Sequence, residues 1–518
     1  MEDSGQARVT KYKVYSCMMK KIFRSPLFWM VSFGIFYWIS RLIHLTTLPI
    51  FTDEAIYIRW AQIGGRDASW RFISLTDGKQ PLFTWIMMVF VRYIQDPLYA
   101  GRLASVFSGF FGMLGMYVLG REVFQRGRIG ILSSFLYLIS PFALFYDRLA
   151  LYDSLVSAFS VWNLYLAILL VRRVRLDIAL IFGLTLGVGM LNKTSAFFSL
   201  YLLPVTLLLF DWKEKQRIRR FFTWIGLVLV SITLSQLVYS ILRLSPYFYI
   251  IAQKDTIFVY PFSLWIQHPF EFFYGNIHGM FNWLIGYMSW PIFLCAIVSL
   301  FFSIKSLREK LVCIFWWIFP FIALALFGRV LYPRHIFFMT MPLLILSAWT
   351  FDMLLTRIRN RVLTVLILGL LCIINLYSSW TIIYTIKAAH IPKSEMGQYI
   401  DDWPSGWGVP EIVSFMKNES IKEKVSIYTE GTFGLLPYAF EIYLGDNPNI
   451  DIHGIWPIHS EIPEEILESA AQHSTYFVMY QGQTPPFQWQ SYLKKLAEYQ
   501  KGLNKNSSMR LYKVIPNQ

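Results

Sequence analysis

Two adjacent carboxylates, Asp53 and Glu54, are the first residues in this chain whose type and position could do chemistry. They lie in the stretch FTDEAIYIRWA, just after an apolar segment that begins near Leu27. A carboxylate beside a membrane face is costly to desolvate and commonly serves binding or catalysis. The alternative is a helix N-terminus, where Asp favours the cap and Glu the first turn. Glu54 is the better candidate for such a supporting role, through a hydrogen bond or an ion pair.

Other ionisable residues share the predicted membrane face of this pair. They are Lys79, Asp147, Arg148, Asp153, Asn192, Lys193, Arg334 and His335, each at an outer end of an apolar segment. Structural alternatives remain open for all of them: Asp153 as a helix cap, Asp147 with Arg148 as a local pair, the lysines as interfacial side chains, and His335 as a structural histidine. Scattered surface charges would have no reason to favour one face, so we predict one shared external site.

Carboxylates next to several cations suit an anionic lipid head group together with a hydroxyl that must lose a proton. Lys79, Lys193 and Arg334 could hold a phosphate. Asp53 could act as the general base. The aspartates could instead bind a divalent cation. The four cysteines show no metal-ligand spacing. We expect no metal and no other cofactor.

The composition predicts elements that would position these residues in a bilayer. The chain has 518 residues, of which 55% are hydrophobic and 18% aromatic, so a polytopic membrane protein is expected. The net charge of +15 lies in short loops between apolar segments, which suits membrane orientation better than binding of nucleic acid. The segment 81–94 is short for a crossing and is expected to be interfacial or re-entrant. With that assignment, every cluster of three or more basic residues falls in the cytoplasm.

About eleven transmembrane helices result, with the N-terminus inside and the C-terminus outside. The predicted spans are 26–45, 98–119, 129–145, 155–171, 178–191, 196–210, 222–242, 283–304, 312–327, 336–355 and 362–386. The predicted domains are a cytoplasmic segment 1–25, a transmembrane domain 26–386 and an external soluble domain 387–518. External loops are predicted at 46–97, as the catalytic loop, and at 243–280. The predicted location is the plasma membrane.

The segment after Lys387 has a soluble pattern. Short strands are expected at 425–428, 450–453, 476–480 and 510–514, and helices at 410–417, 435–444, 463–471 and 488–499. Alternating helices and strands predict a small α/β domain with a largely parallel sheet.

Several motifs resemble one family. TDEAIYIRWAQ is similar to the first external loop of the GT-C membrane glycosyltransferases, in particular the protein O-mannosyltransferases and aminoarabinose (lipid A) transferases. DGKQPLFTWI resembles the family's Lys-Pro-Pro-Leu motif, and AGRLASVFSGFFGMLGMYVLGREVF its next segment, with Arg102. YDRLALYDSL, GMLNKTSAFFSLYLLP and YPRHIFFMTMPLLIL resemble later motifs, at Arg148 and Asp153, at Lys193, and at Arg334, His335 and Pro342. The resemblance covers roughly residues 27–355. GKQP in place of the double proline and His335 in place of a tyrosine depart from the family pattern.

The resemblance implies a GT-C fold, a polyprenyl-phosphate-linked sugar as donor, and the loop aspartate as base. The expected function is transfer of one sugar to an acceptor hydroxyl on the external face, with inversion. Asp53, Glu54 and Asp153 are the catalytic candidates, and Lys79, Arg148, Lys193, Arg334 and His335 are the candidates for binding phosphate or substrate. The expected partners are the donor, membrane lipid and an acceptor of unassigned class: protein, lipid or glycan. The alternative is a transporter or lipid flippase, which would place ionisable residues inside broken, repeated helices. This sequence shows no repeat.

Overall fold

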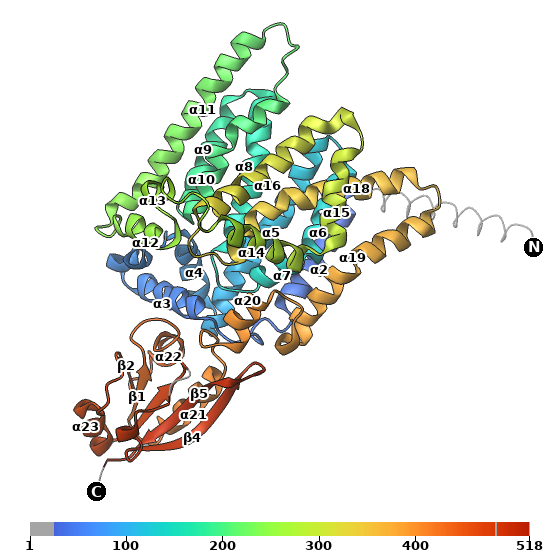
Figure 1. Ribbon diagram of the computed structural model, residues 1–518. Helices are drawn as coiled ribbons and strands as arrows, with labels where there is room; N and C mark the ends of the chain where they lie inside the picture. The colour runs from blue at the N-terminus through green and yellow to red at the C-terminus, as the bar shows by residue number, and fades with distance from the viewer. Residues whose placement is uncertain (1–24, 482–483, 517–518) are drawn as a thin grey trace, which may run out of the picture.

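A bundle of helices stands against a small α/β domain in the computed structural model, which describes residues 25–481 and 484–516 (Figure 1). The helices of the bundle are α2 (Pro26–Leu42), α3 (Thr52–Arg66), α4 (Leu82–Tyr93), α5 (Pro97–Phe124), α6 (Gly127–Ile139), α7 (Pro141–Asp147), α8 (Asp153–Arg173), α9 (Leu176–Met190), α10 (Phe197–Tyr201), α11 (Arg217–Tyr239), α12 (Ile250–Phe258), α13 (Phe262–Trp265), α14 (Phe273–Met288), α15 (Trp290–Phe301), α16 (Leu307–Phe327), α17 (Arg334–Phe337), α18 (Met341–Arg357) and α19 (Arg361–Tyr384). The predicted segment 1–25 lies, apart from Ser25, outside the described residues.

Within the described residues, six helices are long and apolar enough to cross a membrane, or up to eight if each of two bent pairs counts as one span. Helix α4 is one of the shorter apolar helices, as the length of the segment 81–94 suggested. The protein is therefore a multi-pass membrane protein. The number of eleven spans and the orientation of the termini remain predictions.

Two predicted spans are bent. The segment 129–145 forms α6 and α7 with an angle of 62° between them, and the segment 283–304 forms α14 and α15 with an angle of 104°. Ser140 and Ser289 lie at the breaks, and a proline stands in the first turn of each following helix. Proline disfavours helical backbone in the residue before it, which explains the break at Ser140, directly before Pro141. At the second break, Ser289 has φ +65°, outside the helical region.

Close helix packing in the bundle depends on small residues. Gly183 and Gly187 on α9 face Ser231 and Ser235 on α11, and a Cβ at either glycine would lie within 3.0 Å of α11 backbone atoms. Small residues allow such close approach between membrane helices.

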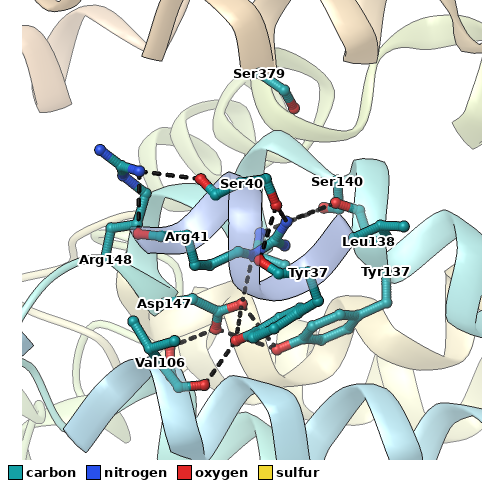
Figure 2. Close-up of polar contacts among 12 residues, drawn as sticks. Tyr37, Ser40, Arg41, Val106, Tyr137, Leu138, Ser140, Asp147, Arg148 and Ser379 are labelled. Atoms are coloured by element: carbon teal, nitrogen blue, oxygen red, sulfur yellow. Dashed lines mark hydrogen bonds and ion pairs between the residues drawn. The ribbon is translucent and has the colours of Figure 1, made fainter. Parts of the chain in front are cut away.

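A buried ion pair joins α2 to α7 (Figure 2). The Arg41 Nε lies 3.4 Å from an Asp147 carboxylate oxygen, and Tyr37, Tyr137 and Ser154 also donate hydrogen bonds to this carboxylate. Both charged side chains are fully buried, so removing either one would leave an uncompensated charge. Asp147 therefore has a structural environment and does not belong to the external site.

The α/β domain contains a mixed five-stranded sheet. Its helices are α21 (Val409–Glu419), α22 (Tyr438–Leu444) and α23 (Glu464–Gln472), and its strands are β1 (Val425–Glu430), β2 (Ile450–Ile455), β3 (Ser474–Met479), β4 (Leu493–Lys501) and β5 (Asn504–Val514). The strand order is β2-β1-β3-β5-β4. Only β2, β1 and β3 are parallel, since β5 pairs antiparallel with both β3 and β4. The expectation of a largely parallel sheet was therefore wrong for the last two strands.

The helix predicted at 488–499 is also wrong. Residues from Leu493 onward form β4, which continues into β5 through a hairpin. Lys, Leu, Ala, Glu and Gln favour helix, but this preference is weak, and pairing of β4 along β5 overrides it.

The α/β domain is fixed to α3, the helix that carries Asp53. The Arg59 Nε lies 2.6 Å from Glu441 Oε2 on α22, and the Gln62 side chain donates to the Ile442 carbonyl at 3.0 Å. The connecting segment, which is residues 385–408 between α19 and α21, also contacts the start of α3, because the Thr52 N–H donates to the Pro404 carbonyl at 3.1 Å. Figure 1 shows α3 lying between the bundle and the sheet.

Candidate functional site

The N-terminus of α3 directs its two carboxylates to different surroundings. Glu54 is fully buried and forms a two-pronged ion pair with Arg102 on α5, at 2.8 and 2.7 Å. Its two oxygens also accept the N–H groups of Phe51 and Ala150, at 3.0 and 2.7 Å. Arg102 in turn donates to the carbonyls of Leu45, Leu48 and Pro49. Glu54 therefore fixes the shape of the 45–54 loop, as its predicted supporting role requires.

Asp53 pairs with a cation from a distant part of the chain. The Arg334 Nη1 on α17 lies 2.7 Å from Asp53 Oδ2. Burial opposes ionisation of Asp53, but Arg334 and the nearby Lys79 and Lys193 outweigh it and hold the pKa of this carboxyl below its usual 3.8. The Arg334 guanidinium lies over the rings of Tyr332 and Phe51, at 4.9 and 5.9 Å. Asp53 is therefore an ionised carboxylate at neutral pH.

A second carboxylate–cation pair lies at the start of α8. The Lys193 Nζ, in the turn after α9, lies 2.7 Å from Asp153 Oδ1. The neighbouring Asn192 side chain donates to the Tyr152 carbonyl at 3.2 Å and so holds this turn against α8.

Five of the eight predicted site residues line one cavity of about 620 Å³: Lys79, Asp153, Lys193, Arg334 and His335. Its remaining walls are largely apolar and come from α10, α12 and α16, with Phe197, Phe198, Tyr201, Phe258, Ala323, Leu324 and Phe327 among them. Asp53 is connected to the cavity through its ion pair with Arg334. The lining of the cavity thus combines cations, some of them beside Asp53, with many apolar side chains.

Lys79 differs from the other cations of this cavity. Gly78, at φ +67°, turns the chain before Lys79, and the Lys79 Nζ lies 5.4 Å from the centre of the Phe258 ring. Burial lowers the pKa of Lys79, and the Asp53 charge only partly offsets this effect. No salt bridge to Lys79 occurs within the described part of the chain. Its ammonium group is therefore free to bind an anion.

Arg148 and His335 have contacts that differ from the predicted binding role. The Arg148 guanidinium donates to the carbonyls of Ser40, Arg41, Ile43 and His44 at the end of α2, so it satisfies a helix terminus and does not line the cavity. His335 lines the cavity, but its Nδ1 accepts the Tyr332 N–H at 3.4 Å, which leaves Nε2 for a ligand.

Sequence reasoning missed three polar groups near this site. Lys254 and Asp255 on α12 line the cavity, and Lys254 pairs with Asp77. Glu395 is fully buried in the connecting segment and accepts hydrogen bonds from Tyr146 and Tyr287, at 2.6 and 2.7 Å. Burial raises the pKa of Glu395 to about 7. Lys254 and Asp255 lie within a predicted loop, and Glu395 follows the last predicted span, so no span end marked any of them.

The three aspartates that sequence analysis offered to a divalent cation lie in separate ion pairs. Asp53 pairs with Arg334, Asp153 with Lys193, and Asp147 with Arg41. Among the described residues, no group of three or more His, Cys, Asp or Glu side chains could hold a metal ion.

Comparisons with known proteins bear on both the sequence and the fold. Residues 78–239 match the family described as dolichyl-phosphate-mannose-protein mannosyltransferase. The undecaprenyl phosphate-alpha-4-amino-4-deoxy-L-arabinose arabinosyl transferase of Pseudomonas aeruginosa (strain UCBPP-PA14) is 28% identical over 201 residues, which are 36% of this chain. The match spans 35% of that relative's length.

The fold is similar to that of ArnT from Cupriavidus metallidurans. The structures of ArnT in the apo state and bound to undecaprenyl phosphate give TM-scores of 0.57 and 0.58. Each alignment covers 94% of this chain and 97% of ArnT, at 14% identity. The predicted fold class is thereby confirmed. The chain is a GT-C-fold membrane protein that resembles the mannosyltransferases and aminoarabinose transferases.

Proposed function

We propose that this protein is an integral membrane glycosyltransferase that moves one sugar from a polyprenyl-phosphate carrier to an acceptor hydroxyl on the external face. The observation that carries the proposal is the cavity itself, in which an unpaired, half-buried cation, Lys79, and a largely apolar lining lie together beside an ionised Asp53. A polyprenyl phosphate has the same division, with an anionic head and an apolar chain. Two relatives support this choice, since the Pseudomonas protein is named for an undecaprenyl-phosphate-linked donor and ArnT binds undecaprenyl phosphate.

The phosphate is assigned to the cationic side chains of the cavity lining. Lys79 supplies an unpaired charge, and Lys193 and Arg334 supply further donors. Arg334 can hold Asp53 and a phosphate oxygen together, because a guanidinium has five N–H donors and its Nε has no partner among the described residues. The polyprenyl chain then lies along the apolar wall formed by α10, α12 and α16.

Asp53 is assigned as the general base. The acceptor oxygen forms a bond to the anomeric carbon, its proton passes to Asp53, and the bond from that carbon to the phosphate oxygen breaks. The polyprenyl phosphate leaves with the electron pair, so a single displacement inverts the anomeric centre. Lys79, Lys193 and Arg334 stabilise the charge that develops on the departing phosphate. Asp153 keeps Lys193 in position through their ion pair.

The test is sugar transfer by the purified full chain, offered a panel of radiolabelled polyprenyl-phosphate sugars and host membrane extract. Asp53→Asn should lower transfer at least about hundredfold, as expected for loss of a general base, while donor binding is retained. Asp67→Asn is the matched control, because Asp67 follows the last residue of the same helix and is exposed. Transfer that survives Asp53→Asn would assign the base elsewhere. A protein that binds and consumes no donor of the panel would overturn the proposed function.

A further inference from the structure

The carboxyl ends of the three parallel strands β2, β1 and β3 form a second candidate binding site, separate from the cavity. From β1 the chain passes to β2 on one side, then returns to β3 on the other side of β1. The connections after β1 and β3 therefore diverge at this end of the sheet. In open α/β sheets, ligands bind in the crevice outside the carboxyl ends of the strands where the strand order reverses.

A buried carboxylate spans the gap between these two strand ends. Glu430 is the last residue of β1, and its Oε2 accepts the N–H groups of Tyr480 and Gln481 after β3, both at 3.0 Å. Its Oε1 is buried and has no hydrogen-bond partner among the described residues. Lys501 also holds the segment after β3, since its Nζ donates to the Tyr480 carbonyl at 2.9 Å. A buried polar atom without a partner is costly, and a ligand hydroxyl would satisfy it.

Two exposed aromatic side chains flank this end of the sheet. Phe433 follows β1 and is 49% exposed, and Trp456 follows β2 and is 52% exposed. The segments that carry them lie side by side, because the Gly431 N–H donates to the Ile455 carbonyl at 2.8 Å. Aromatic faces beside a few placed polar groups are typical of small-ligand sites.

This end of the sheet also faces the start of α3. Gly434 has φ +125°, and a Cβ at this position would lie 3.6 Å from Thr52 Cγ2. The Phe433 ring lies 6.5 Å from the ring of Trp60 on α3. Thr52 immediately precedes Asp53, so a ligand held at this end of the sheet would lie close to the proposed base.

We infer that the α/β domain binds a carbohydrate at the carboxyl ends of β1 and β3. The apolar face of a pyranose ring would stack on Phe433 or Trp456, and a sugar hydroxyl would donate to Glu430 Oε1. The inference rests on the proposed function for one step, which is that this carbohydrate belongs to the acceptor. With that step, the inference narrows the class of acceptor to a glycan or a glycan-bearing molecule.

The test measures carbohydrate binding directly and needs no transfer. The full chain is placed in phospholipid nanodiscs, which avoids sugar-based detergents, and saturation-transfer NMR is recorded with methyl glucoside, mannoside, galactoside and N-acetylglucosaminide. At least one pyranoside should receive saturation on its ring protons. Phe433→Ala and Trp456→Ala should each raise its Kd about two- to tenfold, the range for loss of one aromatic contact, and the double variant should raise it about four- to hundredfold. Ile421→Ala is the control, because Ile421 is an exposed apolar residue before the amino end of β1.

The inference is overturned if no pyranoside of the panel binds above empty nanodiscs, or if the double variant binds as tightly as the parent chain. Retained binding of undecaprenyl phosphate to each variant shows that the membrane part is intact. Pyranoside binding without donor consumption would refute the transferase proposal and leave the carbohydrate site standing. Donor consumption that needs Asp53 but occurs without pyranoside binding would do the reverse.

Discussion

Asp53 and Glu54 are neighbours on one turn of α3, yet the protein uses the two carboxylates in opposite ways. Glu54 has four hydrogen bonds at fully buried positions and faces Arg102, whose own donors are engaged by loop carbonyls. Asp53 has one ion pair, to an arginine that borders a cavity and retains an unpartnered Nε. The difference teaches that a carboxylate with every acceptor site filled holds structure, whereas one with free acceptor capacity beside a cavity is available to a substrate.

The largest effect on stability is expected from breaking the buried ion pair between Glu54 and Arg102. Glu54→Gln leaves the buried Arg102 charge without its counter-ion, so the free energy of unfolding should fall by about 3–5 kcal/mol. Denaturant titration in detergent measures it. Asp53→Asn is the matched variant, and its effect on stability should be much smaller. A loss below about 1 kcal/mol for Glu54→Gln would show that the pair contributes little.

The pH dependence of transfer would sharpen the contrast. The pKa of Asp53 is held below 3.8, so the carboxylate is ionised at neutral pH and loses its charge only as the pH falls through that lowered value. The stabilisation from its ion pair is likewise complete above the unfolded pKa of about 3.9 and is lost below the folded one. Arg334→Met removes the positive charge that lowers the pKa of Asp53 most. This pKa should therefore rise, and the acid limb of the transfer rate should move to higher pH.

The measurement is transfer rate against pH for the parent chain and for Arg334→Met, each at saturating donor. Arg329→Met is the control, because Arg329 lies five residues before Arg334 and forms no salt bridge within the described residues. An acid limb that stays at the same pH in Arg334→Met would separate Asp53 from the observed titration.

Removing the unpaired cation should give an intermediate effect. Lys79→Met deletes one charge-assisted contact to the donor phosphate, so the Kd for undecaprenyl phosphate should rise about tenfold to hundredfold. Binding to the purified chain at constant salt measures this. Lys215→Met, in an exposed loop, should leave the Kd unchanged. Equal Kd values for the parent chain and Lys79→Met would show that Lys79 does not bind the donor phosphate.

The smallest effects on stability are expected for ion pairs that are exposed to solvent. Arg59 and Glu441, which dock the α/β domain on α3, are about one-fifth exposed, whereas Arg66 and Asp446 are more than half exposed. A double-mutant cycle should give a coupling of about 0.5–1 kcal/mol for the first pair and near zero for the second. Equal couplings would show that burial does not control the strength of this interface.

Five of the ionisable cavity residues could be predicted because each stands at the end of an apolar segment, where an ionisable side chain is unusual. This pattern led to Lys79, Asp153, Lys193, Arg334 and His335, all of which line the cavity. The same pattern also included Arg148, which instead satisfies the end of α2. Position along the chain cannot distinguish these cases, because the difference lies in which carbonyls a folded neighbour leaves unsatisfied.

In the α/β domain, the central strands could be predicted from the sequence. The conformation of the segment 488–499, which was predicted to be a helix, could not. Apolar β-branched and aromatic residues marked β1, β2 and β3. The segment 488–499 has local preferences for helix, and the pairing of β4 with β5 decides its conformation.

By itself, the sequence determined a polytopic helical protein with a C-terminal α/β domain, because runs of apolar residues and their charged flanks follow from the thickness and polarity of a bilayer. It also determined which residue types are available near Asp53. Only the tertiary structure decided that Arg334, 281 positions away, pairs with Asp53, that Glu54 is enclosed, and that the α/β domain rests on α3. These outcomes depend on distances between elements far apart in the chain, and local patterns carry no information about such distances.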